Sequence, residues 1–145
     1  MSTTQPIRSK QLLHDFKEYY LTKQPNSRNY TLILIGLNTA LRINDILHLT
    51  WGDVYCTEHS RFYTHLLITE KKTEKETRIL INRELQETLL SYRKTQTSIA
   101  DTDYLFPSPR KADSPLSRYQ AYRIVRKAAE AVGIEDVIRC HSLRK

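Results

Sequence analysis

The chain has 145 residues and a formal net charge of +7, and 39% of its residues are hydrophobic. This composition predicts a single folded domain and excludes a disordered tail. The longest apolar stretch, residues 32–37, is far shorter than the roughly 20 residues of a membrane-spanning helix, so a membrane protein is excluded. The first residues contain no apolar signal core and only two cysteines are present, so we expect a cytoplasmic protein with free thiols.

The N-terminal part of the chain predicts helices. Residues 1–8 form a lead-in, and apolar side chains at helical spacing predict a helix over residues 9–22. Residues 30–39 are almost wholly apolar and carry no charge, so we expect a buried central helix there. A shorter apolar pattern predicts a further helix over residues 43–49.

The middle of the chain predicts a small antiparallel sheet. Residues 62–69 and 77–82 are rich in Thr, Ile, Leu and aromatic side chains, and the wholly polar run between them predicts a β-hairpin with a charged tip. A short strand near Val54 would be the third member of this sheet. Residues 83–94 then predict a helix with leucines on its inner face.

The C-terminal part predicts a loop and then helical structure. Residues 101–113 form the loop, which carries a Tyr-Leu-Phe-Pro segment as an apolar anchor. Ser117 can cap a helix that stops at Gly133, and residues 137–145 form a last element. Together these elements predict an α+β fold, mainly α, with helices around a small antiparallel three-stranded sheet.

Four places carry cationic side chains at the edges of predicted elements, and two of them combine a cation with a second polar group. Arg42 lies between two helices, and Asp45 follows one turn later, where it could orient the guanidinium. The alternative for this pair is an ordinary helical ion pair. His141 and Arg144, three residues apart, share one helical face and can hold a phosphate together.

The other two places are the hairpin tip and the outer face of the helix that Ser117 caps. A lysine on a short hairpin can reach into a groove as a proton donor, whereas the alternative is a charged edge that prevents aggregation. The helix face is either solvated or in contact with a phosphate backbone. The tip carries Lys71, Lys72 and Lys75. The candidate DNA-binding cations are Lys71 and Lys75 at the tip and Arg118, Arg123, Arg126 and Lys127 on the helix.

Other kinds of site are excluded by residue spacing. The three glycines are isolated, so no Gly-rich phosphate loop can form. Cys56, His59 and His65 have no second Cys/His pair at a fitting distance, which argues against a zinc site. We therefore expect neither a metal site nor a cofactor.

Three segments, in order along the chain, carry a family resemblance. Residues 39–53, Thr-Ala-Leu-Arg-Ile-Asn-Asp-Ile-Leu-His-Leu-Thr-Trp-Gly-Asp, resemble the first arginine box of the tyrosine recombinases, the phage integrase family. Residues 72–78 resemble the family's β-hairpin with its catalytic lysine, and residues 140–145 resemble its second box, His-x-Leu-Arg. The resemblance covers residues 9–145 and implies the tyrosine recombinase catalytic domain fold.

The resemblance implies site-specific recombination by DNA cleavage and rejoining. In this family a tyrosine attacks a DNA phosphodiester to form a 3′-phosphotyrosine, and fixed cations stabilise the five-coordinate transition state without a metal. The residues that would surround this phosphate are the clamps Arg42 and Arg144, the general acid Lys72 or its neighbour Lys71, His141 as a donor to the phosphate or an aid to the nucleophile, and Asp45, which would hold Arg42.

The positions of the tyrosines depart from the family pattern. The family's nucleophile follows the second box, whereas all nine tyrosines of this chain precede His141. We therefore assign no nucleophile and expect a truncated catalytic domain, incomplete at its C-terminus and inactive by itself. The alternatives are a non-catalytic DNA-binding module, a decayed integrase remnant and a protein with incidental charge.

The expected partner is double-stranded DNA, and no membrane is involved. Family members act as tetramers on paired sites, so the resemblance also implies a homo-oligomer. A bacterial, phage or mobile-element origin is implied in the same way.

Overall fold

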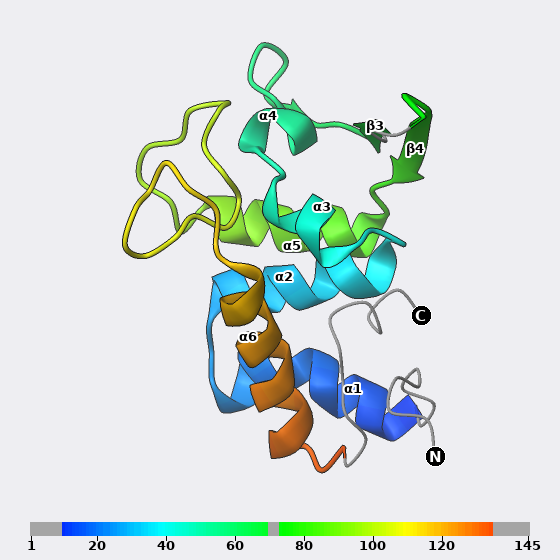
Figure 1. The fold of residues 1–145 in the computed structure, drawn as a ribbon, viewed down its shortest axis with the longest axis vertical. Helices are drawn as coiled ribbons and strands as arrows, with labels where there is room; N and C mark the ends of the chain where they lie inside the picture. Colours follow the sequence, from blue (N-terminus) through cyan, green and yellow to red (C-terminus); the bar gives the residue numbers. More distant parts are fainter. Residues whose placement is uncertain (1–9, 70–72, 135–145) are drawn as a thin grey trace.

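The computed structural model describes residues 10–69 and 73–134. The fold is mixed α and β and mainly helical, which confirms the predicted fold class (Figure 1). No helix in the described stretches is long and apolar enough to cross a membrane. The elements in chain order are α1 (Lys10–Glu18), the π-helix η1 (Tyr19–Lys23), α2 (Ser27–Asn38), α3 (Ile43–Leu47), α4 (Trp51–Val54), β1 (Tyr55–Cys56), β2 (Arg61–Phe62), β3 (His65–Thr69), β4 (Glu76–Leu80), α5 (Arg83–Arg93) and α6 (Arg118–Ala131).

Helix α2 forms the centre of the core, as its apolar sequence predicts. Residues 31–36 are all buried, and α2 contacts α1, η1, α3 and α5. The helix crosses the middle of the molecule, with α5 along one side and α1 on the other (Figure 1). It begins earlier than predicted because the Asn26 side chain accepts a hydrogen bond from the Asn29 backbone N–H at 3.0 Å and so caps the helix at Ser27.

The strands form two two-stranded antiparallel sheets, β1–β2 and β3–β4, rather than the predicted three-stranded sheet. Val54, expected in the third strand, is the last residue of α4. The reason is local, because Thr50 and Asp53 form a capping box that starts a helical turn at Trp51. Strand β1 begins at the next residue and pairs with β2 across the tight turn of residues 57–60, so it does not join the hairpin.

The long loop between α5 and α6 is held in the core by the apolar anchor that the sequence predicts. Leu105 and Phe106 are both 0% exposed. The Tyr92 hydroxyl donates to the Leu105 carbonyl at 2.5 Å, and the Leu105 N–H donates to the Leu49 carbonyl at 3.0 Å. The Leu116 N–H donates to the Phe106 carbonyl at 2.7 Å, so the anchor also fixes where α6 begins.

Two buried tyrosines are expected to lower the stability of the fold at alkaline pH. Burial raises the pKa of Tyr20 to about 12 and the pKa of Tyr92 to about 12. An unfolded tyrosine ionises near pH 10, so the unfolded state holds fewer protons than the folded state between about pH 10 and 12. We expect the free energy of unfolding, measured with urea, to fall across this interval by about 2 kcal/mol for each tyrosine.

The control is the double variant Tyr20→Phe/Tyr92→Phe, measured over the same pH interval. Its free energy of unfolding is expected to start lower, because two hydroxyl hydrogen bonds are lost, and then to change less with pH. An equal fall in both proteins would show that other groups cause the alkaline loss.

Candidate nucleic-acid interface

Arg42 lies at the junction where α2 ends and α3 begins. Thr39 ends α2, and its hydroxyl donates to the Ile35 carbonyl at 2.8 Å. Leu41 and Ile43, on either side of Arg42, are buried with 5% and 8% exposure. Arg42 itself has an extended backbone and an exposed side chain that pairs with no other described residue. The backbone is therefore anchored on both sides of Arg42, while the guanidinium is exposed and unpaired among the described residues.

Asp45 is half-buried in the first turn of α3. The ion pairs in the described part of the chain do not include one between Arg42 and Asp45. Arg42 is therefore not held in an ordinary helical ion pair there. The role of Asp45 in orienting Arg42 stays a prediction.

A hydrogen-bond network joins the segment before Arg42 to the end of the β-hairpin. The Asn82 side chain, which caps α5 just after β4, donates to Asn38 Oδ1 at 2.7 Å. Asn38, at the end of α2, donates in turn to Glu84 Oε1 at 3.2 Å. Lys17 Nζ contacts Glu84 Oε2 at 2.7 Å, and this hydrogen bond lowers the pKa of Glu84. The network therefore fixes the position of the end of α2, just before Arg42, relative to the end of the β-hairpin.

The β-hairpin is anchored at its base and carries its charges at the other end. Leu66 on β3 pairs with Ile79 on β4, and Leu66 is buried with 2% exposure. The last strand pair is Thr69 with Glu76, so Lys75 lies just beyond the paired residues, where it is exposed. Strand β3 contacts α4, and the hairpin lies at the edge of the molecule, far from α1 and α6 (Figure 1). Lys71 and Lys72 lie outside the described residues.

Helix α6 has one buried face and one charged face. Ser117 and Gln120 form a capping box that starts the helix, and Gly133, with φ of +84°, follows its end. Apolar spacing predicts an inner stripe of Ala121, Ile124, Val125, Ala128 and Val132; the first four are buried and Val132 is half-buried, while Ala129 is buried in addition. The exposed cations form what we term the basic face, namely Arg118, Arg123, Arg126 and Lys127.

Aromatic rings lie among the cations of the basic face. The Arg123 guanidinium is 5.8 Å from the Tyr119 ring centroid, and the Arg126 guanidinium is 5.7 Å from the Tyr122 ring centroid. Arg126 also pairs with Glu130 at 3.2 Å. These contacts steer the arginine side chains along the helix surface, and exposed contacts of this kind remain weak enough for a phosphate to replace.

The structure places two of the predicted groups on neighbouring elements. Helix α3, which begins directly after Arg42, contacts α6. Arg42 is therefore carried by an element that packs against the helix with the basic face. His141 and Arg144 lie outside the described residues, so their roles stay predictions.

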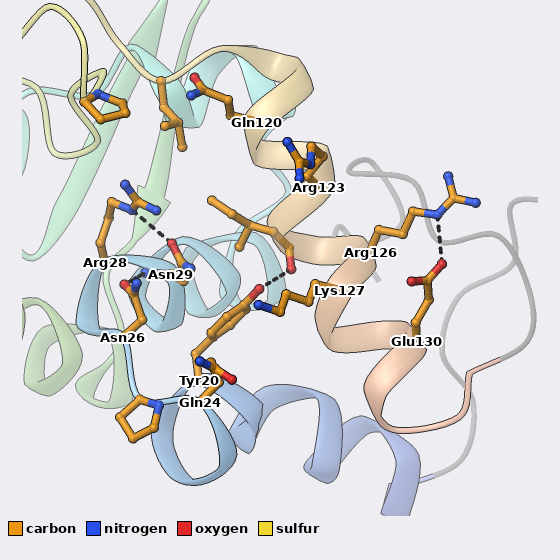
Figure 2. Close-up of a pocket in the computed structure, with 14 residues that line it drawn as sticks. Tyr20, Gln24, Asn26, Arg28, Asn29, Gln120, Arg123, Arg126, Lys127 and Glu130 are labelled. Carbon is orange, nitrogen blue, oxygen red and sulfur yellow. Dashed lines mark hydrogen bonds and ion pairs between the residues drawn. The ribbon is translucent and has the colours of Figure 1, made fainter.

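Arg28 is a further cation at this surface, and no sequence motif marks it. This residue lies in the first turn of α2 and lines a groove of about 560 Å³ together with Arg123 and Lys127 of α6. Figure 2 shows α2 on one side of this groove and α6 on the other. No sequence signal could have found Arg28, because the groove forms only when two segments far apart in the chain pack together.

The described residues offer no metal centre, since they contain no group of three or more His, Cys, Asp and Glu side chains that could hold an ion. The candidate interface in this part of the chain consists of cations, aromatic rings and amides. Such a surface suits a polyanion.

The chain belongs to the phage integrase family, because the model of that family matches residues 5–145. It is 43% identical over 145 residues to the "Probable integrase/recombinase YoeC" of Bacillus subtilis (strain 168), and the match covers 100% of this chain and 73% of that protein.

Solved structures show the same fold. The XerA recombinase has a TM-score of 0.75 and 21% identity, and the match covers 98% of this chain and 48% of that one. Lambda integrase bound to DNA has a TM-score of 0.67 and 18% identity, with 99% and 49% covered. A lambda integrase tetramer bound to a Holliday junction has a TM-score of 0.66 and 18% identity, with 99% and 40% covered. The chain thus spans about half the length of these structures, or less.

Proposed function

We propose that residues 9–145 form the catalytic domain of a site-specific recombinase that binds double-stranded DNA. The observation that carries this proposal is the exposed guanidinium of Arg42, which pairs with no described residue and directly precedes α3, a helix in contact with α6. The family match and the DNA-bound integrase among the similar structures support a DNA phosphate as its ligand.

The proposed chemistry is DNA cleavage and rejoining through a 3′-phosphotyrosine intermediate. A tyrosine hydroxyl attacks the phosphorus, the bond to the 5′-oxygen breaks, and negative charge grows on the equatorial oxygens. Arg42 and Arg144 would stabilise that charge, and His141 would donate to the phosphate or accept the proton that the attacking tyrosine hydroxyl loses. Lys72, or Lys71 in its place, would protonate the leaving 5′-oxygen.

We propose that none of the nine tyrosines in these 145 residues is the nucleophile. Tyr20 and Tyr92 are buried, and their hydroxyls donate to backbone carbonyls. Tyr119 and Tyr122 lie beside arginines of the basic face, where contact with DNA or packing explains them. The role proposed for these 145 residues is therefore to bind the phosphate and to stabilise the charge that grows on it.

We further propose that the protein acts as a homo-oligomer on paired DNA sites. This proposal rests on one of the similar structures, the lambda integrase tetramer on a Holliday junction.

The test is the salt dependence of DNA binding, measured by fluorescence anisotropy on a labelled 30-base-pair duplex. Five phosphate contacts, from Arg42 and the basic face, give an expected slope of about −4.5 in log K against log salt. The affinity should then fall roughly 500-fold between 50 and 200 mM KCl. An affinity that changes less than about tenfold would support incidental charge instead.

A matched pair of variants locates the binding surface. Replacing the four cations of the basic face by glutamine should reduce the slope to about −1. The control replaces four exposed cations elsewhere, namely Lys10, Arg61, Arg83 and Lys94. This control has the same net charge, so a slope that falls as far as in the first variant would refute α6 as the contact surface.

A further inference from the structure

The groove between η1, α2 and α6 is a built feature, separate from Arg42. The Tyr20 hydroxyl donates to the Ile124 carbonyl at 2.7 Å, which ties η1 to α6 along its floor. Tyr20 is only 3% exposed, so this bond lies inside the protein and keeps the two walls together. The groove of about 560 Å³ is large enough for a phosphate and part of the sugar backbone that carries it.

The charges that line the groove are unbalanced. Arg28, Arg123, Arg126 and Lys127 face a single acidic residue, Glu130. Glu130 pairs with Arg126 at 3.2 Å. Among the described residues, no carboxylate pairs with the other three cations. The groove therefore attracts an anion.

Arg28 is the most strongly positioned of these cations. Its Nε donates to Asn29 Oδ1 at 2.9 Å, and Asn29 is only 7% exposed. The backbone N–H of Asn29 is in turn held by Asn26 Oδ1 at 3.0 Å. This arrangement orients the guanidinium and leaves its two terminal nitrogens without a partner in the described part of the chain (Figure 2). Half-buried donors of this kind are stabilised when a ligand supplies acceptors.

We propose that this groove binds a backbone phosphate of DNA, with Arg28 as its central ligand and Arg123 and Lys127 on the opposite wall. The inference rests on the proposed DNA-binding function and adds a contact point to it. Helix α2 has 12 residues and separates this groove from Arg42 by about 18 Å. Because base pairs stack about 3.4 Å apart, the groove would hold a phosphate on the order of five base pairs from the one at Arg42.

A DNA phosphate fits better here than an acidic peptide because the groove opens beside the basic face, which itself offers further contacts along a phosphate backbone. Lys127 and Arg123 belong to both surfaces. An extended polyanion can therefore contact the groove and the helix at the same time. Once one phosphate is bound, its neighbours along the backbone are held at a high effective concentration near the second surface.

The experiment compares Arg28→Gln with Arg83→Gln on the labelled 30-base-pair duplex. Arg83 is an exposed arginine on α5, and its side chain is 92% exposed. We expect Arg28→Gln to bind about tenfold more weakly near 100 mM salt and to reduce the salt slope by about 0.9. Arg83→Gln should match the parent protein. Equal slopes for the two variants would overturn the proposal while leaving the proposed function intact.

A second variant, Asn29→Asp, tests the groove without removing the arginine. The new carboxylate would pair with Arg28 in the first turn of α2, where negative charge is tolerated, so the fold should be kept. The salt slope should fall as in Arg28→Gln. An unchanged slope with an unchanged thermal midpoint would overturn the proposal.

Two further probes distinguish a DNA phosphate from other anionic ligands. Inorganic pyrophosphate and a 20-residue polyglutamate are titrated against the parent protein and Arg28→Gln. DNA would be overturned as the ligand by two results together. Arg28→Gln would weaken the binding of pyrophosphate or polyglutamate, and it would leave the salt slope of DNA binding unchanged. If the parent protein itself shows no steep salt dependence, the proposed function fails and this inference fails with it.

Discussion

Replacing Phe106 by alanine is expected to lower the free energy of unfolding by about 3–5 kcal/mol. Phe106 is 0% exposed, and its ring stacks on Tyr92 at 6.1 Å between centroids with an interplanar angle of 14°. The residue anchors a long loop rather than a helix or strand, so its removal leaves a cavity and also loosens the start of α6. Since domains of this size are stable by only about 5–15 kcal/mol, this one change threatens the fold.

The measurement is urea unfolding followed by circular dichroism at neutral pH. The matched control is Tyr119→Ala, an aromatic residue that is 70% exposed on α6. It should change the free energy of unfolding by no more than about 0.5 kcal/mol. A loss below about 1 kcal/mol for Phe106→Ala would mean that the loop is not an anchor.

The variant Arg42→Gln is expected to keep its stability and lose DNA affinity. Its side chain is exposed and has no partner in the described stretches, so the free energy of unfolding should change by less than about 0.5 kcal/mol. A charge-assisted contact to one phosphate is worth about 1.5–3 kcal/mol, so affinity for a preferred site should fall roughly 10- to 100-fold.

The preferred site is obtained by enriching duplexes from a random pool with the parent protein. Binding of Arg42→Gln to the enriched duplexes is then compared with binding to the unselected pool, where the loss should be only about threefold because the register varies. Arg83→Gln serves as the control for charge alone. A uniform loss on both pools would favour a DNA-binding module that has no site for a particular phosphate.

Most helices could be predicted because their signals are local. The apolar run of α2, the leucines of α5 and the capping box before α6 each lie within a few turns of chain. The strand expected near Val54 was wrong for an equally local reason. The capping box of Thr50 and Asp53 outweighed the β-propensity of the following residues and placed Val54 in a helix.

The candidate site could be predicted only in part. Motif order pointed to Arg42 and periodicity pointed to the basic face, and the structure places both on elements in contact. The roles of Lys71, Lys72, His141 and Arg144 stay predictions, because these residues lie outside the described part of the chain. Arg28 carried no motif and no periodic signal, so nothing in the sequence set it apart from other surface arginines.

The sequence by itself determined the family, the central helix and the cationic character of α6, because each depends on residue types at short spacing. Only the tertiary structure decided that Arg28 faces Arg123 and Lys127 across one groove, and that Asn38 meets Asn82 beside the hairpin. These relations depend on how whole helices pack, which is set by the sum of many buried contacts. No short segment of sequence contains that sum.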